Sequence, residues 1–108
     1  MINFENIEET AVPEFRKGKG ETKMKQISDG KTKIMQVTLE PGNSIGKHTH
    51  DTNCEVMHII SGVASCTLNG EDETVLPGQA HYCPKGSEHS VENKSSEPLV
   101  MFAVVAEQ

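Results

Sequence analysis

The sequence predicts an all-β domain, either a sandwich or a closed barrel. Short runs with β-type alternation follow one another at close intervals, and turn residues separate them. No window has sustained helical periodicity. The 108 residues fit one domain, because single hydrophobic cores commonly occupy about 100–150 residues. Closure of the sheet would also remove exposed strand edges.

The predicted strands follow from the alternation of apolar side chains. The first begins at Thr32 and ends at Pro41-Gly42, which forces a turn. Farther along, Asn69-Gly70 is the strongest hairpin signal in the chain. Five further runs are predicted as strands: Glu55–Ser61, Val63–Leu68, Glu73–Leu76, Gln79–Cys83 and Leu99–Ala106.

Residues 1–30 are polar with scattered apolar positions, and we expect an N-terminal arm or short edge strands that pack on the barrel. The barrel domain is predicted to span residues 31–108. Residues 1–30 contain one basic stretch. Glu14 and Glu21 interrupt this stretch, and two glycines break any helical face in it. We therefore expect a solvated loop or edge strand for its cations, which are Arg16, Lys17, Lys19, Lys23 and Lys25.

Charge and cysteine content narrow the function classes. The net charge of -6 and the pI near 5.3 argue against nucleic acid or anionic membrane as partner, since phosphate-binding surfaces need surplus Lys and Arg. The start, MINFENIEET, is acidic where a signal peptide is basic, and no apolar run approaches the ~18 residues that span a bilayer. Cys54, Cys66 and Cys83 include no CxxC pair, which suits a reducing compartment. We expect a soluble cytoplasmic protein.

The segment 42–62 carries two histidines and a glutamate in a pattern typical of metal ligands. Alternate side chains of an extended strand share a face, so His48 and His50 point the same way. Glu55 leads the next strand, and a turn through residues 51–54 can fold its carboxylate back toward the two imidazoles. Borderline divalent metals favour such a set of nitrogen and oxygen ligands.

A further histidine lies in the segment 78–93. Pro84 and Gly86 make a tight corner, after which His89 opens the next strand. If that strand crosses the barrel beside the first pair, the ligand set is three histidines and one glutamate. The competing interpretation is a group of polar residues without a metal, and four residues in register favour the metal site.

Both segments resemble the two motifs of the cupin family, residue for residue and without an insertion. The first motif is matched by Gly42, His48, His50, Glu55 and Gly62, and the second by Gly78, Pro84, Gly86, His89 and Asn93. The motifs span residues 42–93, about half of the chain. In this the sequence is similar to small single-domain cupins of the conserved-barrel type.

The resemblance implies a double-stranded β-helix of the jelly-roll type, with a metal near one mouth of the barrel. In the family, the three histidines and the glutamate are the metal ligands, and one face of the barrel often forms a homodimer. Gln79 departs from the family pattern, which often has Asp after the motif glycine. The departure affects turn chemistry and leaves the ligands intact.

The sequence also predicts where two side chains near the ligands lie, those of His58 and Cys54. If Glu55 faces the lumen, alternation places His58 on the outside, which favours an outer-face or dimer-interface role. Cys54 is adjacent to a ligand in sequence, and we expect a small buried hydrophobe there. Neither residue is predicted to bind the metal.

The strand 79–83 leaves two arrangements open. Either His81 with Cys83 or Ala80 with Tyr82 lines the cavity, and the sequence does not fix which face points inward. The phenol of Tyr82 is able to act as an acid or as a hydrogen-bond donor to a substrate. We nevertheless expect buried packing as the role of Tyr82.

The predicted chemistry depends on open metal positions. Four protein ligands on a metal that prefers five or six leave one or two positions for water or substrate. With the resemblance, this predicts one divalent Fe, Mn, Ni or Zn ion and a metal-dependent enzyme of dioxygenase, decarboxylase or isomerase type, acting on a small oxygenated or carboxylated metabolite. The alternative is a non-catalytic module that binds or senses a small molecule. An acid or base beside the open position favours catalysis, and an apolar lumen favours binding.

Overall fold

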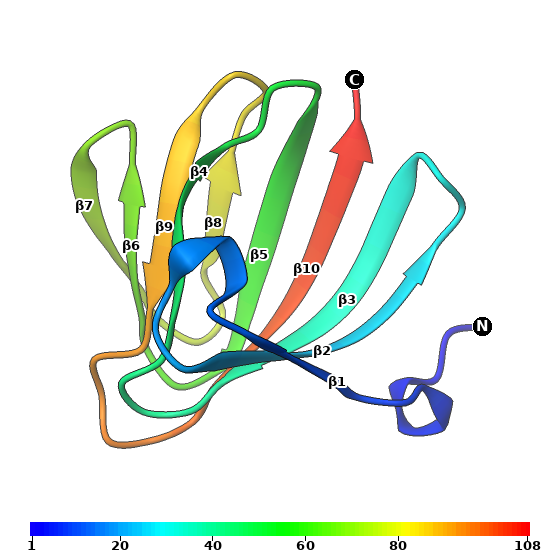
Figure 1. Cartoon of the computed structure of the whole chain (residues 1–108), viewed down its shortest axis with the longest axis horizontal. Coiled ribbons are helices and arrows are strands. Elements are labelled where there is room, and N and C mark those ends of the chain that lie inside the picture. The colour runs from blue at the N-terminus through cyan, green and yellow to red at the C-terminus, as the bar shows by residue number, and fades with distance from the viewer.

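The computed structural model describes all 108 residues and contains two facing antiparallel sheets (Figure 1). The larger sheet has the order β1-β2-β3-β10-β5-β8, and the smaller one has the order β4-β9-β6-β7. The strands are β1 Thr10–Pro13, β2 Glu21–Ser28, β3 Thr32–Leu39, β4 Ser44–Thr49, β5 Asn53–Ser61, β6 Ala64–Leu68, β7 Glu71–Val75, β8 Ala80–Cys83, β9 Glu88–Glu92 and β10 Leu99–Glu107. The structure has no helix with the length and hydrophobicity that a transmembrane span requires.

The all-β prediction is confirmed, and most strands lie where alternation places them. The hairpin at Asn69-Gly70 is also confirmed, because both residues have positive φ, 50° and 84°, as a tight two-residue turn requires. This turn pairs Leu68 directly with Glu71. Strand β7 therefore begins and ends earlier than the predicted run, and Leu76 lies beyond it with 45% of its surface exposed.

The core lies between the two sheets and follows the period-two alternation of the strands. Leu39, Ile59 and Leu99 are fully buried in it. Its sulfur-containing members are Met35, Met57, Met101 and Cys66, all of them buried on strands. The other members are Val37, Ile45, Ala64, Val75, Val91, Ala103 and Val105.

The first 30 residues contribute β1 and β2 to the larger sheet. Strand β2 pairs with β1 on one side and with β3 on the other. Between β1 and β2 a short turn, Phe15–Lys17, lies against β4 of the smaller sheet, where Figure 1 shows it in front of that strand. A domain boundary at residue 30 stays a prediction.

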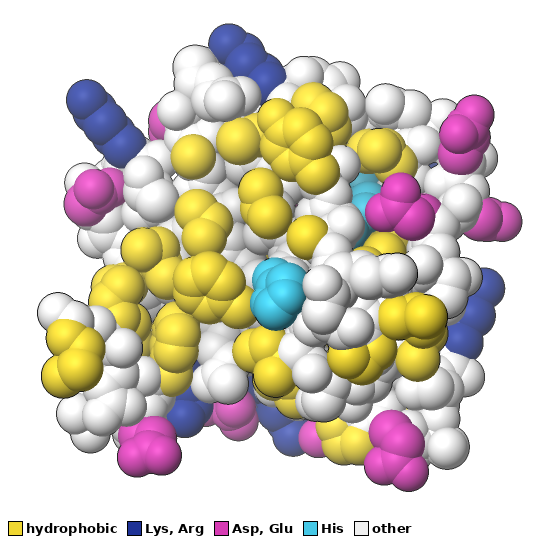
Figure 2. Space-filling view, turned by 180° about the vertical axis from the view of Figure 1, so that it is seen from behind, with side chains coloured by type: hydrophobic (Ala, Val, Ile, Leu, Met, Phe, Trp, Pro, Cys, Tyr) yellow, Lys and Arg dark blue, Asp and Glu magenta, His cyan; other side chains and the backbone are white.

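The outer face of the larger sheet is apolar. Val56 and Ile60 on β5 are 40% and 49% exposed, and the exposed His58 lies between them, as alternation predicts. Figure 2 shows hydrophobic side chains gathered across one face of the molecule around a histidine. Tyr82 is 50% exposed, so the expectation that it packs in the interior is wrong. Its strand pairs Glu55 with Cys83, which turns Tyr82 outward.

Candidate metal centre

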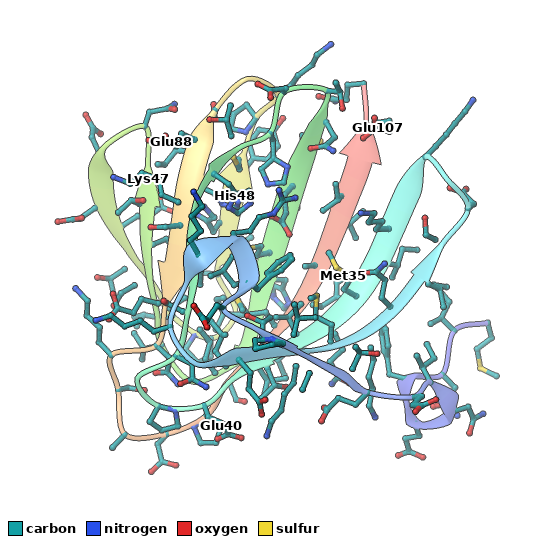
Figure 3. The ribbon with its side chains drawn as sticks, in the orientation of Figure 1. Met35, Glu40, Lys47, His48, Glu88 and Glu107 are labelled. Carbon is teal, nitrogen blue, oxygen red and sulfur yellow. The ribbon has the colours of Figure 1, made fainter.

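The four predicted ligands come together at one end of the space between the sheets. The possible ligand atoms of His48, His50, Glu55 and His89 all lie within 4.8 Å of one another. Strand β4 supplies His48, which extends inward from it in Figure 3, and His50 follows that strand directly. Glu55 lies on β5 and His89 on β9, so the cluster joins both sheets.

A bulge in β4 directs His48 toward this cluster. Ile45 pairs with Val91 and His48 pairs with His89, so β4 uses one more residue than β9 between the two pairs. Ile45 is buried in the core, and in a regular strand a residue three positions later would point to the opposite face. The extra residue of the bulge re-aims His48 inward.

Backbone pairing fixes the other ligands. The His50 amide donates to the carbonyl of Ser87 at 3.0 Å, and the His50 carbonyl accepts from the Gly86 amide at 2.6 Å. The Pro84–Gly86 corner predicted from the sequence therefore holds the end of β4. Glu55 pairs with neighbours on both sides, in β8 and β10, and is buried.

Hydrogen bonds at Nδ1 set the tautomers of His48 and His50. Nδ1 of His48 lies 2.7 Å from the Gly46 carbonyl oxygen, which only accepts, so this nitrogen carries the proton. The Asn53 amide nitrogen donates to the Glu107 carboxylate at 2.8 Å, which leaves the Asn53 oxygen to accept from Nδ1 of His50. In both histidines the lone pair is then on Nε2.

Two successive hydrogen bonds, from His89 to His81 and from His81 to Glu73, set the tautomer of His89. Nδ1 of His81 lies 2.8 Å from the Glu73 carboxylate and therefore donates to it. Nε2 of His81, 3.0 Å from Nδ1 of His89, accepts the proton of that ring. The Nε2 lone pair of His89 consequently faces the cluster. Such partners orient metal-bound histidines and raise their basicity.

The resulting donor set fits one divalent metal ion. The three Nε2 atoms are 3.0–3.2 Å apart, and Oε1 of Glu55 lies 3.2 Å from Nε2 of both His50 and His89. Donors at right angles around an ion, each at about 2.1 Å, are separated by about 3.0 Å. Four acceptor atoms in such close contact repel one another unless a cation lies between them.

The charge states of the ligands agree with this donor set. Although burial raises the pKa of Glu55, hydrogen bonds with His50 and His89 lower it to about 2, so the carboxylate is ionised. Burial lowers the pKa of His48 to about 4, helped by the neighbouring histidines, so this ring is neutral. The hydrogen bond with Glu55 raises the pKa of His50. A metal at this site would therefore compete with a proton at His50.

A cavity of about 190 Å³ opens beside the cluster. Apolar side chains, including the buried Met35 labelled in Figure 3, form one part of its wall. The polar part contains the four ligands and four other side chains: Arg16, Gln26, Lys33 and Asn53. The cavity contains no carboxylate or imidazole other than the four ligands.

Several residues of the site were not found from the sequence. His81 is fully buried and faces inward together with Cys83, which resolves the arrangement that alternation left open. Arg16 is exposed, as expected for a solvated stretch, but its place in the cavity wall was not predicted. Asn53 and its partner Glu107 are 54 positions apart and carry no local signal of their pairing. Gln79 acts within its turn, since its side chain accepts from the Leu76 amide at 2.9 Å.

Comparison with known proteins places the chain among cupins. A family model described as a cupin domain matches residues 35–105. The oxalate-binding protein of Thermotoga maritima is 28% identical over 111 residues, which cover 97% of this chain and 92% of that protein.

Solved structures agree on the architecture. The crystal structure of a predicted oxalate decarboxylase from Thermotoga maritima has a TM-score of 0.94 at 26% identity and covers 100% of this chain and 99% of its own. The cupin domain of Cnp3 from Schizosaccharomyces pombe has a TM-score of 0.81 at 13% identity, with 100% of this chain and 74% of that one covered. The predicted double-stranded β-helix of jelly-roll type is confirmed.

Proposed function

Because the chain belongs to the cupin domain family, we propose that it holds one divalent metal ion on His48, His50, Glu55 and His89 and uses it to bind a small carboxylate. One observation carries the proposal: the Nε2 atoms of three histidines with fixed tautomers converge with the Glu55 carboxylate at the wall of a cavity. The resident ion would supply Lewis acidity and an anchoring point for an oxygen ligand.

The spacing of the donors suits an ion in either common geometry. Octahedral donors at about 2.1 Å are separated by about 3.0 Å and tetrahedral donors by about 3.4 Å, and the Nε2 atoms lie 3.0–3.2 Å apart, between the two values. Manganese, iron, nickel and zinc all accept nitrogen and oxygen ligands. The remaining positions would face the cavity.

Cavity size and charge support a small anion as the ligand. A volume of about 190 Å³ is below the ~300 Å³ at which pockets for drug-sized ligands begin. Arg16 and Lys33 lie in its wall and, with a divalent ion, outweigh the single charge of Glu55. The name of the relative from Thermotoga maritima, an oxalate-binding protein, agrees with a carboxylate.

Binding without turnover is the function that the cavity supports best. Arg16 is permanently charged, which leaves Lys33 as the one side chain beyond the ligands that is able to transfer a proton there. Acid–base catalysis normally uses a positioned acid or base near the reacting atoms. Dioxygenase, decarboxylase or isomerase chemistry is the second candidate, favoured by the open metal positions.

We also propose a cytoplasmic homodimer that uses the outer face of the larger sheet. Val56, Ile60, Tyr82 and Phe102 are between 36% and 50% exposed on strands β5, β8 and β10. An apolar face of this kind is typical of a protein interface. Three free cysteines suit a reducing compartment.

The proposed function is tested by calorimetric titration of oxalate into metal-free and manganese-loaded protein. We expect saturable binding by the loaded protein at one oxalate per chain, and none by the metal-free protein. Mass spectrometry of the recovered oxalate then shows whether the protein only bound the oxalate or converted it. Equal binding with and without metal would contradict the proposal.

A further inference from the structure

The turn that carries Arg16 has an unusual backbone. Glu14, Arg16 and Lys17 all have positive φ, at 49°, 55° and 65°. Residues other than glycine, asparagine and aspartate rarely adopt this left-handed conformation, which costs free energy at each position. Strain of this kind persists only where the surrounding structure imposes it, and it is concentrated at functional sites.

Close packing against β4 imposes this conformation. A Cβ atom on Gly18 would lie 2.1 Å from the Ser44 carbonyl oxygen, and one on Gly46 would lie 2.0 Å from the Arg16 carbonyl oxygen. The two backbones touch directly, which only glycine permits. Lys19 donates its amide to the Ser44 hydroxyl, and the Ser44 amide donates to the Lys19 carbonyl, both at 2.9 Å.

The result is a cationic side chain on a rigidly held backbone at the cavity. Gly46 lies in the β4 bulge, two positions before His48, so the turn is held next to the metal ligands. Phe15 and Arg16 line the cavity, and the Arg16 guanidinium carbon is 5.5 Å from the Phe15 ring centre. Arg16 forms no ion pair and no side-chain hydrogen bond within the chain, so its donors are available to a ligand.

We propose that Arg16 is the residue that selects the ligand, by pairing with the carboxylate oxygens of a small acid whose other oxygens bind the metal. This inference rests on the proposed function and adds the recognition element to it. A guanidinium offers a planar pair of donors that matches a carboxylate. The strained turn explains this position, since it brings the exposed Arg16 side chain to the wall of the cavity.

A matched pair of variants tests the role of Arg16. Arg16→Gly and Lys17→Gly each remove one positive charge, and each places glycine where φ is positive, at 55° and 65°. Only Arg16 lines the cavity. Both variants are expected to melt at or above the wild-type temperature, because glycine relieves the left-handed strain. Metal content should be the same in all three proteins.

Oxalate affinity is then measured by calorimetry on the three manganese-loaded proteins. We expect Arg16→Gly to weaken oxalate binding about tenfold or more, and Lys17→Gly to change it less than about twofold. Partial recovery of the oxalate affinity in Arg16→Lys would support a charge-based contact between residue 16 and oxalate. Equal affinities for Arg16→Gly and wild type, or equal losses in the two glycine variants, would overturn the role of Arg16 while leaving the metal-dependent function intact. A loaded wild type that binds no oxalate would overturn the ligand class in both proposals.

Discussion

The Nε2 atom of His81 lies 3.0 Å from the Nδ1 atom of His89, and the two imidazole planes differ by only 3°. Both rings are buried, and the Glu73 carboxylate lies 2.8 Å from the far nitrogen of His81. His89, the predicted metal ligand on β9, is thereby connected through β8 to a carboxylate on β7, which joins the two sheets beside the site.

Loss of this connection should weaken metal binding. His81→Leu leaves the Nδ1 proton of His89 buried without an acceptor, and loss of such outer partners typically costs about 10–100-fold in affinity. Glu73→Gln keeps an acceptor oxygen and should have a smaller effect. Affinity is measured by competition with a coloured chelator. His58→Leu, on the exposed outer face, is the control; an effect of His81→Leu no larger than that of this control would contradict the connection.

Metal should stabilise the fold strongly. An ion that binds only the native state contributes about 4 kcal/mol at a free concentration of 1,000 times its Kd, which corresponds to a rise in melting temperature of at least about 10 °C for a domain of this size. His48→Ala should remove most of this rise while retaining a cooperative transition. Thermal unfolding followed by circular dichroism, with metal and with a chelator, measures both proteins. The same metal-dependent rise in the variant would show that His48 is not a ligand.

Metal affinity should fall as the pH falls below neutrality. Hydrogen bonding to Glu55 raises the pKa of His50, so this ring must release a proton when the metal binds. The pKa values of Glu55 and His48 are about 2 and about 4, so neither releases a proton at pH 7. Displacement of one proton predicts a loss of about tenfold in affinity per pH unit below the pKa of His50. Titration calorimetry in buffers of different ionisation enthalpy counts the released protons, and constant affinity between pH 5 and 8 would contradict the assignment.

The outer face of the larger sheet should mediate dimer formation. Val56→Lys with Ile60→Lys places two charges on the exposed face of β5, one on each side of His58, and should give a monomer by light scattering, because burying unpaired charge is costly. Thr74→Lys, an exposed position on the smaller sheet, should remain dimeric. A monomeric wild type would contradict the proposed dimer.

The fold and the ligand cluster were predictable because their signals are local. Alternation and turn residues located β3 and β10, and motif spacing located His48, His50, Glu55 and His89. The face of β8 was not predictable, since its four residues mix polar and apolar types. Only the pairing of Cys83 with Glu55 settles which side of β8 points inward.

The residues of the cavity wall were not predictable from the sequence, because their positions depend on contacts between distant parts of the chain. Arg16 belongs to a basic stretch that resembles a solvated loop, and the signal of its position is the close approach of Gly18 and Gly46, which are 28 positions apart. The Asn53–Glu107 hydrogen bond likewise forms only when β10 pairs with β5. Such placements follow from the packed fold and not from any window of sequence.

The metal content per chain is the most direct test of whether His48, His50, Glu55 and His89 hold an ion. Protein is purified without an affinity tag and without oxygen, and its metals are measured by mass spectrometry beside the His48→Ala/His89→Ala double variant. We expect close to one transition-metal ion per chain in the wild type and none in the folded variant. A metal-free wild type that stays empty when manganese, iron, nickel or zinc is supplied, or a variant that retains the full amount, would contradict this expectation.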